Sequence, residues 1–114
     1  MPNTQNLGAK GEELAVQHYK KLGFEVVERN YRYSRGEIDL IVLKKQLLVF
    51  VEVKFRSNIR FGYPEDFVSD KQREMIVTVA DDYIQAIKWK WNIRFDIIAI
   101  DSKLNIEQFE DAFH

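Results

Sequence analysis

Two apolar runs, separated by three polar residues, constrain the fold of this chain more than any other feature of its sequence. Residues 37–43 and 47–55 each have the length and composition of a β-strand, and residues 44–46, Lys-Lys-Gln, have the polarity of a tight turn. The two runs therefore predict an antiparallel hairpin. Both runs are apolar at odd and even positions alike, which is typical of strands that helices cover on both faces. We expect this hairpin to form the centre of an α/β sheet.

Helical and strand patterns on either side of the hairpin complete the predicted fold. Helical patterns cover about residues 4–22 and 69–88, and strand patterns cover residues 24–31 and 93–100. Gly23 is placed to end the first helix, and the capping box Ser69-Asp-Lys-Gln72 to begin the second. The tail from Ile106 is interpreted as a short helix. The order α-β-β-β-α-β predicts a mixed sheet with helices on both faces, in one domain that covers residues 1–114.

Composition narrows the chemistry that such a domain can carry out. The chain has no cysteine and two histidines, so a metal ion would need oxygen ligands. No apolar run reaches the length of a membrane span, and the first residues lack the pattern of a signal peptide, so we expect a cytoplasmic protein with no membrane partner. The net charge of -1 argues against a strong sequence-independent grip on nucleic acid. The N-terminal two thirds are nevertheless slightly basic.

Charged residues inside the apolar patterns indicate a functional site. Glu12 falls within the apolar arc of the first predicted helix. Strand alternation groups Glu37, Asp39 and Ile41 on one face of the first hairpin strand, and Phe50, Glu52 and Lys54 on one face of the second. Unpaired carboxylates gathered there would have raised pKa values, because of desolvation and mutual repulsion, and a divalent cation removes that penalty. The pattern therefore predicts a site for Mg²⁺ or Mn²⁺.

Four motifs carry a resemblance to a known family: Gly8-x-x-Gly11-Glu12, Arg35-Gly-Glu-Ile-Asp-Leu40, Val49-Phe-Val-Glu-Val-Lys-Phe-Arg56 and Arg94-Phe-Asp96. From about residue 6 to residue 100 the sequence resembles the YraN-like family of small bacterial proteins. That family is assigned to the PD-(D/E)XK nuclease superfamily, close to archaeal Holliday junction resolvases. The resemblance implies a restriction-endonuclease-like core and a metal-dependent nuclease that hydrolyses phosphodiester bonds.

The same resemblance implies a role for individual residues. Asp39 and Glu52 would be metal ligands, the backbone carbonyl of Val53 a third ligand, Lys54 the catalytic lysine, and Glu12 an additional acid carried by a helix. Lys54 would orient the attacking water and offset the charge of the transition state. The sequence departs from many family members at Ile38, where they have proline.

Further residues are interpreted from their position near the predicted site. Arg56, Arg60 and Lys71 are candidates for contacts with phosphates, the last with help from a helix dipole. Glu37 either supports the metal ligands or forms an ion pair with Arg35. Nucleic acid, and DNA in particular, is the expected partner, with structured or branched DNA as one substrate class. The sequence leaves open a homodimer, a non-catalytic accessory protein that binds nucleic acid, and a structural domain with a salt-bridged core.

Two other patterns are interpreted as structural. Arg94 and Asp96 alternate on one strand face, which favours an ion pair over a catalytic role. The segment Lys88-Trp-Lys-Trp91 would suit base stacking, but a tryptophan pair at the end of a helix more often forms a hydrophobic lid. We therefore place this segment outside the predicted site.

Overall fold

The chain folds as an α/β structure with a five-stranded mixed sheet and two helices in the part of the chain that is described. The computed structural model describes residues 4–56 and 68–113. In chain order the elements are α1 (Thr4–Lys21), β1 (Glu25–Tyr33), β2 (Gly36–Lys44), β3 (Leu47–Phe55), α3 (Asp70–Ile87), β4 (Asn92–Ile100) and β5 (Ile106–Phe109). No helix among the described residues is both long enough and apolar enough to cross a membrane.

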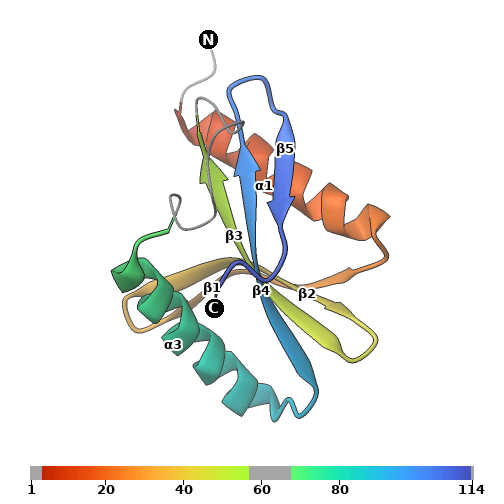
Figure 1. Ribbon diagram of the computed structural model, residues 1–114, viewed down its shortest axis with the longest axis vertical. Helices are drawn as coiled ribbons and strands as arrows, with labels where there is room; N and C mark the ends of the chain where they lie inside the picture. The colour runs from red at the N-terminus through yellow and green to blue at the C-terminus, as the bar shows by residue number, and fades with distance from the viewer. Residues whose placement is uncertain (1–3, 57–67, 114) are drawn as a thin grey trace.

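The strands lie in the sheet in the same order as in the sequence, β1-β2-β3-β4-β5 (Figure 1). The pairs β1–β2, β2–β3 and β4–β5 are antiparallel, and β3–β4 is parallel. The parallel pair arises because α3 crosses from the end of β3 back to the start of β4, as a βαβ connection requires. The predicted hairpin is therefore confirmed, and it contributes two of the three central strands.

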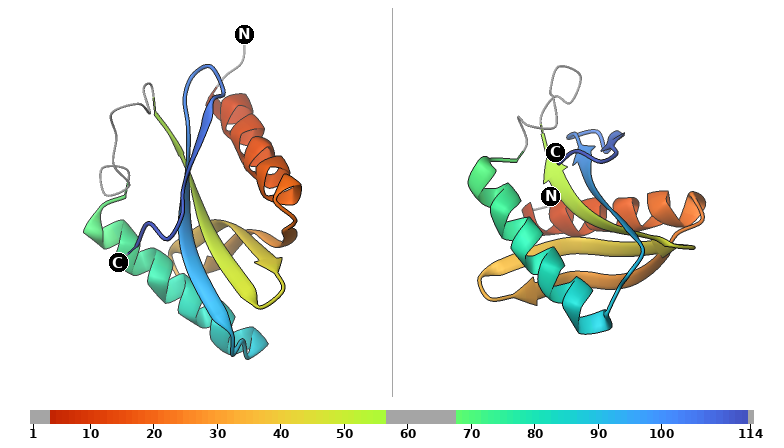
Figure 2. Two further views of the ribbon diagram at one scale, coloured as in Figure 1. Left: turned by 45° about the vertical axis from the view of Figure 1, so that its right-hand side comes forward. Right: turned by 60° about the horizontal axis from the view of Figure 1, so that its bottom comes forward.

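The two helices cover opposite faces of the sheet, as Figure 2 shows. The core under α1 is built from Ala15, Val16 and Tyr19 with Leu40, Val42, Val49, Val51, Ile98 and Ile100. The core under α3 is built from Ile76, Val79, Ala80 and Tyr83 with Val68, Ile38, Ile41, Leu48, Phe50, Ile97 and Ala99. Both faces of the central strands are thus apolar for the reason inferred from the sequence, which is that each face has its own helix.

The C-terminal tail differs from the prediction. Residues Ile106–Phe109 form the edge strand β5 and not a short helix. The reason is the turn before it, in which the Asp101 side chain accepts hydrogen bonds from the backbone N–H groups of Lys103 and Asn105, both at 2.9 Å. This turn reverses the chain, so that Ile106 pairs with Ile100 across a hairpin.

A buried carboxylate joins the tail to the rest of the fold. Asp96 is 1% exposed and accepts five hydrogen bonds: from the Tyr19 hydroxyl, from two nitrogens of Arg94, from the Gln108 amide and from the backbone N–H of Asp111. The structural ion pairing predicted for Arg94 and Asp96 is present, and the two residues pair with each other, at 2.8 Å. These five hydrogen bonds replace the hydration that the Asp96 carboxylate loses when it is buried.

A substitution at Gly36, at the start of β2, can test how closely the β1–β2 hairpin is packed on α3. A Cβ atom there would collide with Sδ of Met75 and Cγ2 of Val79. We expect Gly36→Ala to lower the free energy of unfolding by about 1–3 kcal/mol, the usual cost of overpacking. Gly8→Ala is the matched control, since a Cβ at Gly8 meets no atom within 4 Å and alanine favours a helix. Urea denaturation measures both; equal stability of the two variants would contradict the close packing.

Candidate functional site

The candidate site lies where β2 and β3 part. Their pairing runs from Lys44↔Leu47 at the turn to Leu40↔Val51 and ends there, and the strands then diverge (Figure 1). At this point the backbone N–H of Val53 donates to Oδ2 of Asp39, at 2.7 Å. A side-chain carboxylate therefore takes the place that a backbone carbonyl holds in a regular ladder. The N–H and C=O of one residue point to the same side of a strand, so the Val53 carbonyl also faces this opening.

The side-chain alternation of β2 changes phase beside Asp39. Gly36 and Ile38 face α3, but so does Ile41, three positions after Ile38, while Leu40 packs under α1. The prediction that Glu37, Asp39 and Ile41 share a face is therefore wrong, because regular alternation does not continue through the segment. A one-residue shift of this kind is typical of a β-bulge and turns side chains away from their expected direction.

Asp39 and Glu52 form a closely coupled pair of carboxyl groups. Glu52 is 9% exposed, and Asp39 is half-buried. Burial is the main cause that raises the pKa of both groups, and the charge of Asp39 then helps to raise the pKa of Glu52 to about 8. The interaction between the two side chains raises the pKa of Glu52 and lowers that of Asp39.

The side chains of Lys54 and Gln72 also lie beside Glu52. The Lys54 amine lies 3.6 Å from Oε1 of Glu52 and opposes the rise of its pKa. The Gln72 amide lies 3.4 Å from the same oxygen, a long hydrogen bond that reaches from the first turn of α3. The predicted cap is confirmed, since the Ser69 hydroxyl accepts from the Gln72 backbone N–H. In a capping box the Gln72 side chain would bond back to the cap, and nothing in the sequence indicates that it turns to Glu52.

Two further carboxylates act on the pair from outside it. The charges of Glu12, on α1, and of Glu37 both raise the pKa of Asp39, so both lie close to it. Glu37 forms its ion pair with Arg32, at 3.5 Å, and not with Arg35. Within residues 4–56 and 68–113 no three acidic or histidine side chains gather into a metal cage. The compact part of the site is thus the Asp39–Glu52 pair.

Basic groups lie near the site on two sides. An open cavity of about 250 Å³ at the start of β2 is lined by Arg32, Ser34, Arg35, Gly36 and Glu37, and through Glu37 it adjoins Asp39. Lys71 is exposed on the first turn of α3, beside Gln72. Arg56 is exposed at the end of β3, and Arg60 lies outside the described residues. The cavity was not identified from the sequence, because a strand pattern does not locate a pocket.

The donor groups at this opening match the preferences of Mg²⁺ and Mn²⁺. Two carboxylates and a strand carbonyl offer oxygen atoms, and these ions bind through one or two carboxylates while keeping several waters. The raised pKa of Glu52 is the second sign of a fit, since a cation would offset the charge that burial and Asp39 make unfavourable. Asp39, Glu52 and the Val53 carbonyl are the groups that could hold such an ion.

Comparison with known proteins gives one family. The family model described as "Uncharacterised protein family UPF0102" matches residues 11–100. A UPF0102 protein of Flavobacterium psychrophilum is 40% identical over the whole chain and 98% of its own length. A UPF0102 protein of Christiangramia forsetii is also 40% identical, over 99% of this chain and 98% of its own. One from Clostridioides difficile is 46% identical over 86% of this chain and 87% of its own.

The raised pKa of Glu52 leads to a prediction for the metal-free protein. Its pKa rises from an ordinary 4.5 to about 8, so between these values the folded state keeps a proton that the unfolded state has lost. Stability should therefore fall as the pH rises from 5 to 8. Melting temperatures in a chelator measure this. Glu52→Gln should flatten the slope, and Glu25→Gln, at an exposed carboxylate on β1, should leave it unchanged. A wild-type slope that persists in Glu52→Gln would contradict the assignment.

Proposed function

The chain belongs to the UPF0102 family, in agreement with the YraN-like resemblance of its motifs, and we propose that it is a metal-dependent phosphodiesterase acting on DNA in the cytoplasm. The proposal includes membership of the PD-(D/E)XK superfamily, since Asp39, Glu52 and Lys54 stand in the order and spacing of that signature. Structured or branched DNA is the proposed substrate class. The hydrolysed bond would be a phosphodiester of the backbone.

One observation carries the proposal: two carboxyl groups share a partly buried opening in which the described residues offset their charge only through the Lys54 amine, the Val53 N–H and a long contact from Gln72. The Asp39–Glu52 pair has raised pKa values, and the Lys54 amine opposes this only in part. A site built for stability alone would place donors around such groups, as this protein does around Asp96. Buried carboxyl groups with few hydrogen-bond donors around them, in a site that is partly open to solvent, are typical of a place where a cation and a substrate bind.

The proposed roles follow from where each group lies. A bound Mg²⁺ or Mn²⁺ would polarise a phosphate oxygen and lower the pKa of a water molecule. Asp39 would keep its place through the Val53 N–H while one of its oxygens faces the ion, and Glu52 would release its proton on binding. Gln72 would fix the rotamer of Glu52 from α3. Glu12 would act on the site through its charge or through water.

Lys54 would provide the positive charge that the chemistry needs. Its amine already lies 3.6 Å from Glu52, so it can reach a water or a phosphate oxygen at the same opening. There it would orient the attacking water and offset the negative charge that develops on the phosphorus oxygens. Arg32 and Arg35, which line the adjoining cavity, and Lys71 would contact neighbouring phosphates of the same strand.

The first test of the proposal is metal binding without substrate. Millimolar Mn²⁺ should raise the melting temperature of the wild-type protein, because a ligand that binds only the folded state stabilises it. Asp39→Asn should melt at the same or a higher temperature in a chelator, since a repelled charge is gone, and should lose the response to Mn²⁺. If Asp39→Asn instead costs several kcal/mol and Mn²⁺ shifts neither protein, the acids are structural.

The second test is hydrolysis, on linear, single-stranded, flap and four-way DNA with Mn²⁺. Lys54→Ala should lower the rate by roughly two or more orders of magnitude, the scale of losing one electrostatic stabiliser, while Mn²⁺ binding persists. Glu52→Gln should abolish both. Activity counts only if it co-purifies with the wild type and disappears in both variants. Binding without metal-dependent cleavage by the wild type would favour a non-catalytic accessory protein.

A further inference from the structure

A second group of chemically distinctive residues gathers at the end of the molecule away from the candidate site. The β2–β3 turn carries Lys44 and Lys45, and the connection from α3 to β4 carries Lys88-Trp-Lys-Trp91. The two segments meet where the Asn92 N–H donates to the Gln46 carbonyl, at 3.0 Å. We call the residues Lys44, Lys45, Lys88, Trp89, Lys90 and Trp91 the lysine–tryptophan end. It lies at the start of β3, whereas Glu52 and Lys54 lie near its end.

The lysine–tryptophan end is strongly basic although the chain is not. All four of its lysines are exposed, and α1 adds Lys20 and Lys21, because the Lys44 amine donates to the Leu22 carbonyl at 2.8 Å. None of the ion pairs formed by the described residues within 4 Å uses these six lysines. Glu25, at the start of β1, is the acidic residue next to them in the sheet. Six positive charges thus face solvent on a chain whose net charge is -1.

The two tryptophans differ in a way that their sequence did not indicate. Trp89 packs against the core under α3, and its ring N–H donates to the Asn92 carbonyl at 3.0 Å. Trp91 is 54% exposed and meets the Trp89 ring edge-on, with centroids 5.1 Å apart. The prediction of a hydrophobic lid is therefore wrong for Trp91. Its ring is held in place by an anchored neighbour while much of its surface meets solvent.

We propose that the lysine–tryptophan end binds single-stranded nucleic acid, with phosphates on the lysines and a base stacked on Trp91. Proteins that bind single strands combine these two features, because every base has a face to stack and every nucleotide a phosphate to pair. The surface is separate from the acidic site, because Glu52 comes five positions after Leu47 along β3, a distance of about 16 Å. The proposal shares its ligand class with the proposed function but does not depend on hydrolysis.

An anionic membrane is the other partner that lysines and a tryptophan could suit, and the structure favours it less. Interfacial binding buries a broad apolar face, usually that of an amphipathic helix. Here the large exposed apolar side chains are Trp91, Ile87, Ile93 and Leu22, which come from a connection, the end of α3, the start of β4 and the residue after α1, and so form no single helix face. One ring surrounded by charges fits a single base better than a lipid surface.

The chain provides its own probe for the test, because its two tryptophans both lie at this end. Titration with an oligothymidylate of about 16 nucleotides should quench their fluorescence at low salt, and anisotropy of a labelled strand should give the same affinity. The titration is run in EDTA, so that the result does not depend on a metal or on cleavage. The slope of log affinity against log salt should be about -0.7 for each phosphate that is contacted.

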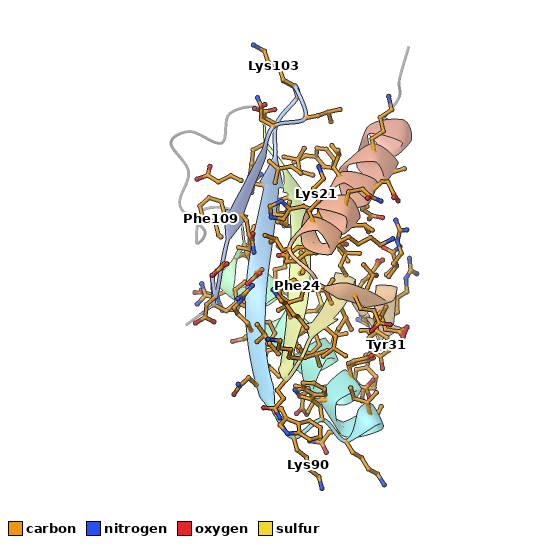
Figure 3. All side chains as sticks on the ribbon, turned by 90° about the vertical axis from the view of Figure 1, so that its right-hand side faces the viewer. Lys21, Phe24, Tyr31, Lys90, Lys103 and Phe109 are labelled. Carbon is orange, nitrogen blue, oxygen red and sulfur yellow. The ribbon has the colours of Figure 1, made fainter. Side chains whose placement is uncertain are left out.

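Variants at exposed positions separate charge from stacking. Lys45→Glu with Lys90→Glu should weaken binding at least tenfold and reduce the salt slope by about 1.4, while Lys45→Arg with Lys90→Arg keeps both. Trp91→Ala should weaken binding by roughly tenfold, and Trp91→Phe by less. Lys103→Glu is the control for altered net charge, because Figure 3 shows Lys103 and Lys90 at opposite ends of the molecule. Circular dichroism checks that each variant is folded.

Three results would overturn the proposal. The first is unquenched tryptophan fluorescence when an oligonucleotide has bound, and the second is equal weakening by Lys103→Glu and by the double glutamate variant. The third is binding to phosphatidylserine vesicles, lost in the double glutamate variant, without binding to the oligonucleotide. Absence of nuclease activity together with quenching that depends on Lys45, Lys90 and Trp91 would support this proposal while the proposed function fails.

Discussion

The hydrogen bond from the Val53 N–H to the Asp39 carboxylate determines where this sheet stops being regular. From the β2–β3 turn back to Leu40, the backbone of β2 pairs with β3. At the preceding residue, the side chain of Asp39 accepts the hydrogen bond of the Val53 N–H in place of a backbone carbonyl. A carboxylate is longer than a carbonyl, so the strands must separate to make room for it. That separation lets the Glu52 side chain and the Val53 carbonyl face an opening. The site is therefore a consequence of how the hairpin ends, and α1 and α3 supply its walls.

Two buried acidic sites in one small protein show what distinguishes a structural carboxylate from a reactive one. Asp96 is fully buried and accepts five hydrogen bonds, two of them from a guanidinium group, so its charge is well compensated. Glu52 has a long contact from Gln72 at 3.4 Å and an amine at 3.6 Å, and it faces a second carboxylate. Desolvation without sufficient donors raises the pKa of Glu52 to about 8. The contrast supports the proposal that the Asp39–Glu52 pair serves binding, whereas Asp96 serves stability.

Much of the fold could be predicted because its signals are local. The hairpin, both helices, the Ser69 cap and the Arg94–Asp96 pair each depend on residues close together in the sequence. The predictions that were wrong concern features that depend on residues far apart in the sequence. Alternation cannot reveal the phase shift beside Asp39, because the shift depends on where pairing with β3 ends. The backbone N–H of Gln72 makes the predicted cap with Ser69. The side chain of Gln72 instead contacts Glu52, which is far from it in the sequence. The tail becomes β5 because the edge of β4 is free to pair. The metal ligands and the role of Lys54 came from resemblance, and they stay predictions.

The segregation of charge along the molecule links the candidate site with the lysine–tryptophan end. A net charge near zero would suggest weak attraction to polyanions, yet the six exposed lysines gather at the start of β3, and the carboxylates lie about 16 Å further along that strand. The net charge alone would give little attraction between this protein and a nucleic acid. If both proposals hold, a nucleic-acid strand that meets the basic end first would be held where its phosphates are neutralised, while the acidic opening would repel it until a cation is bound. Under the two proposals binding and chemistry would have different requirements, since the lysines would act with or without metal, and the carboxylates would accept a phosphate only after a cation had offset their charge.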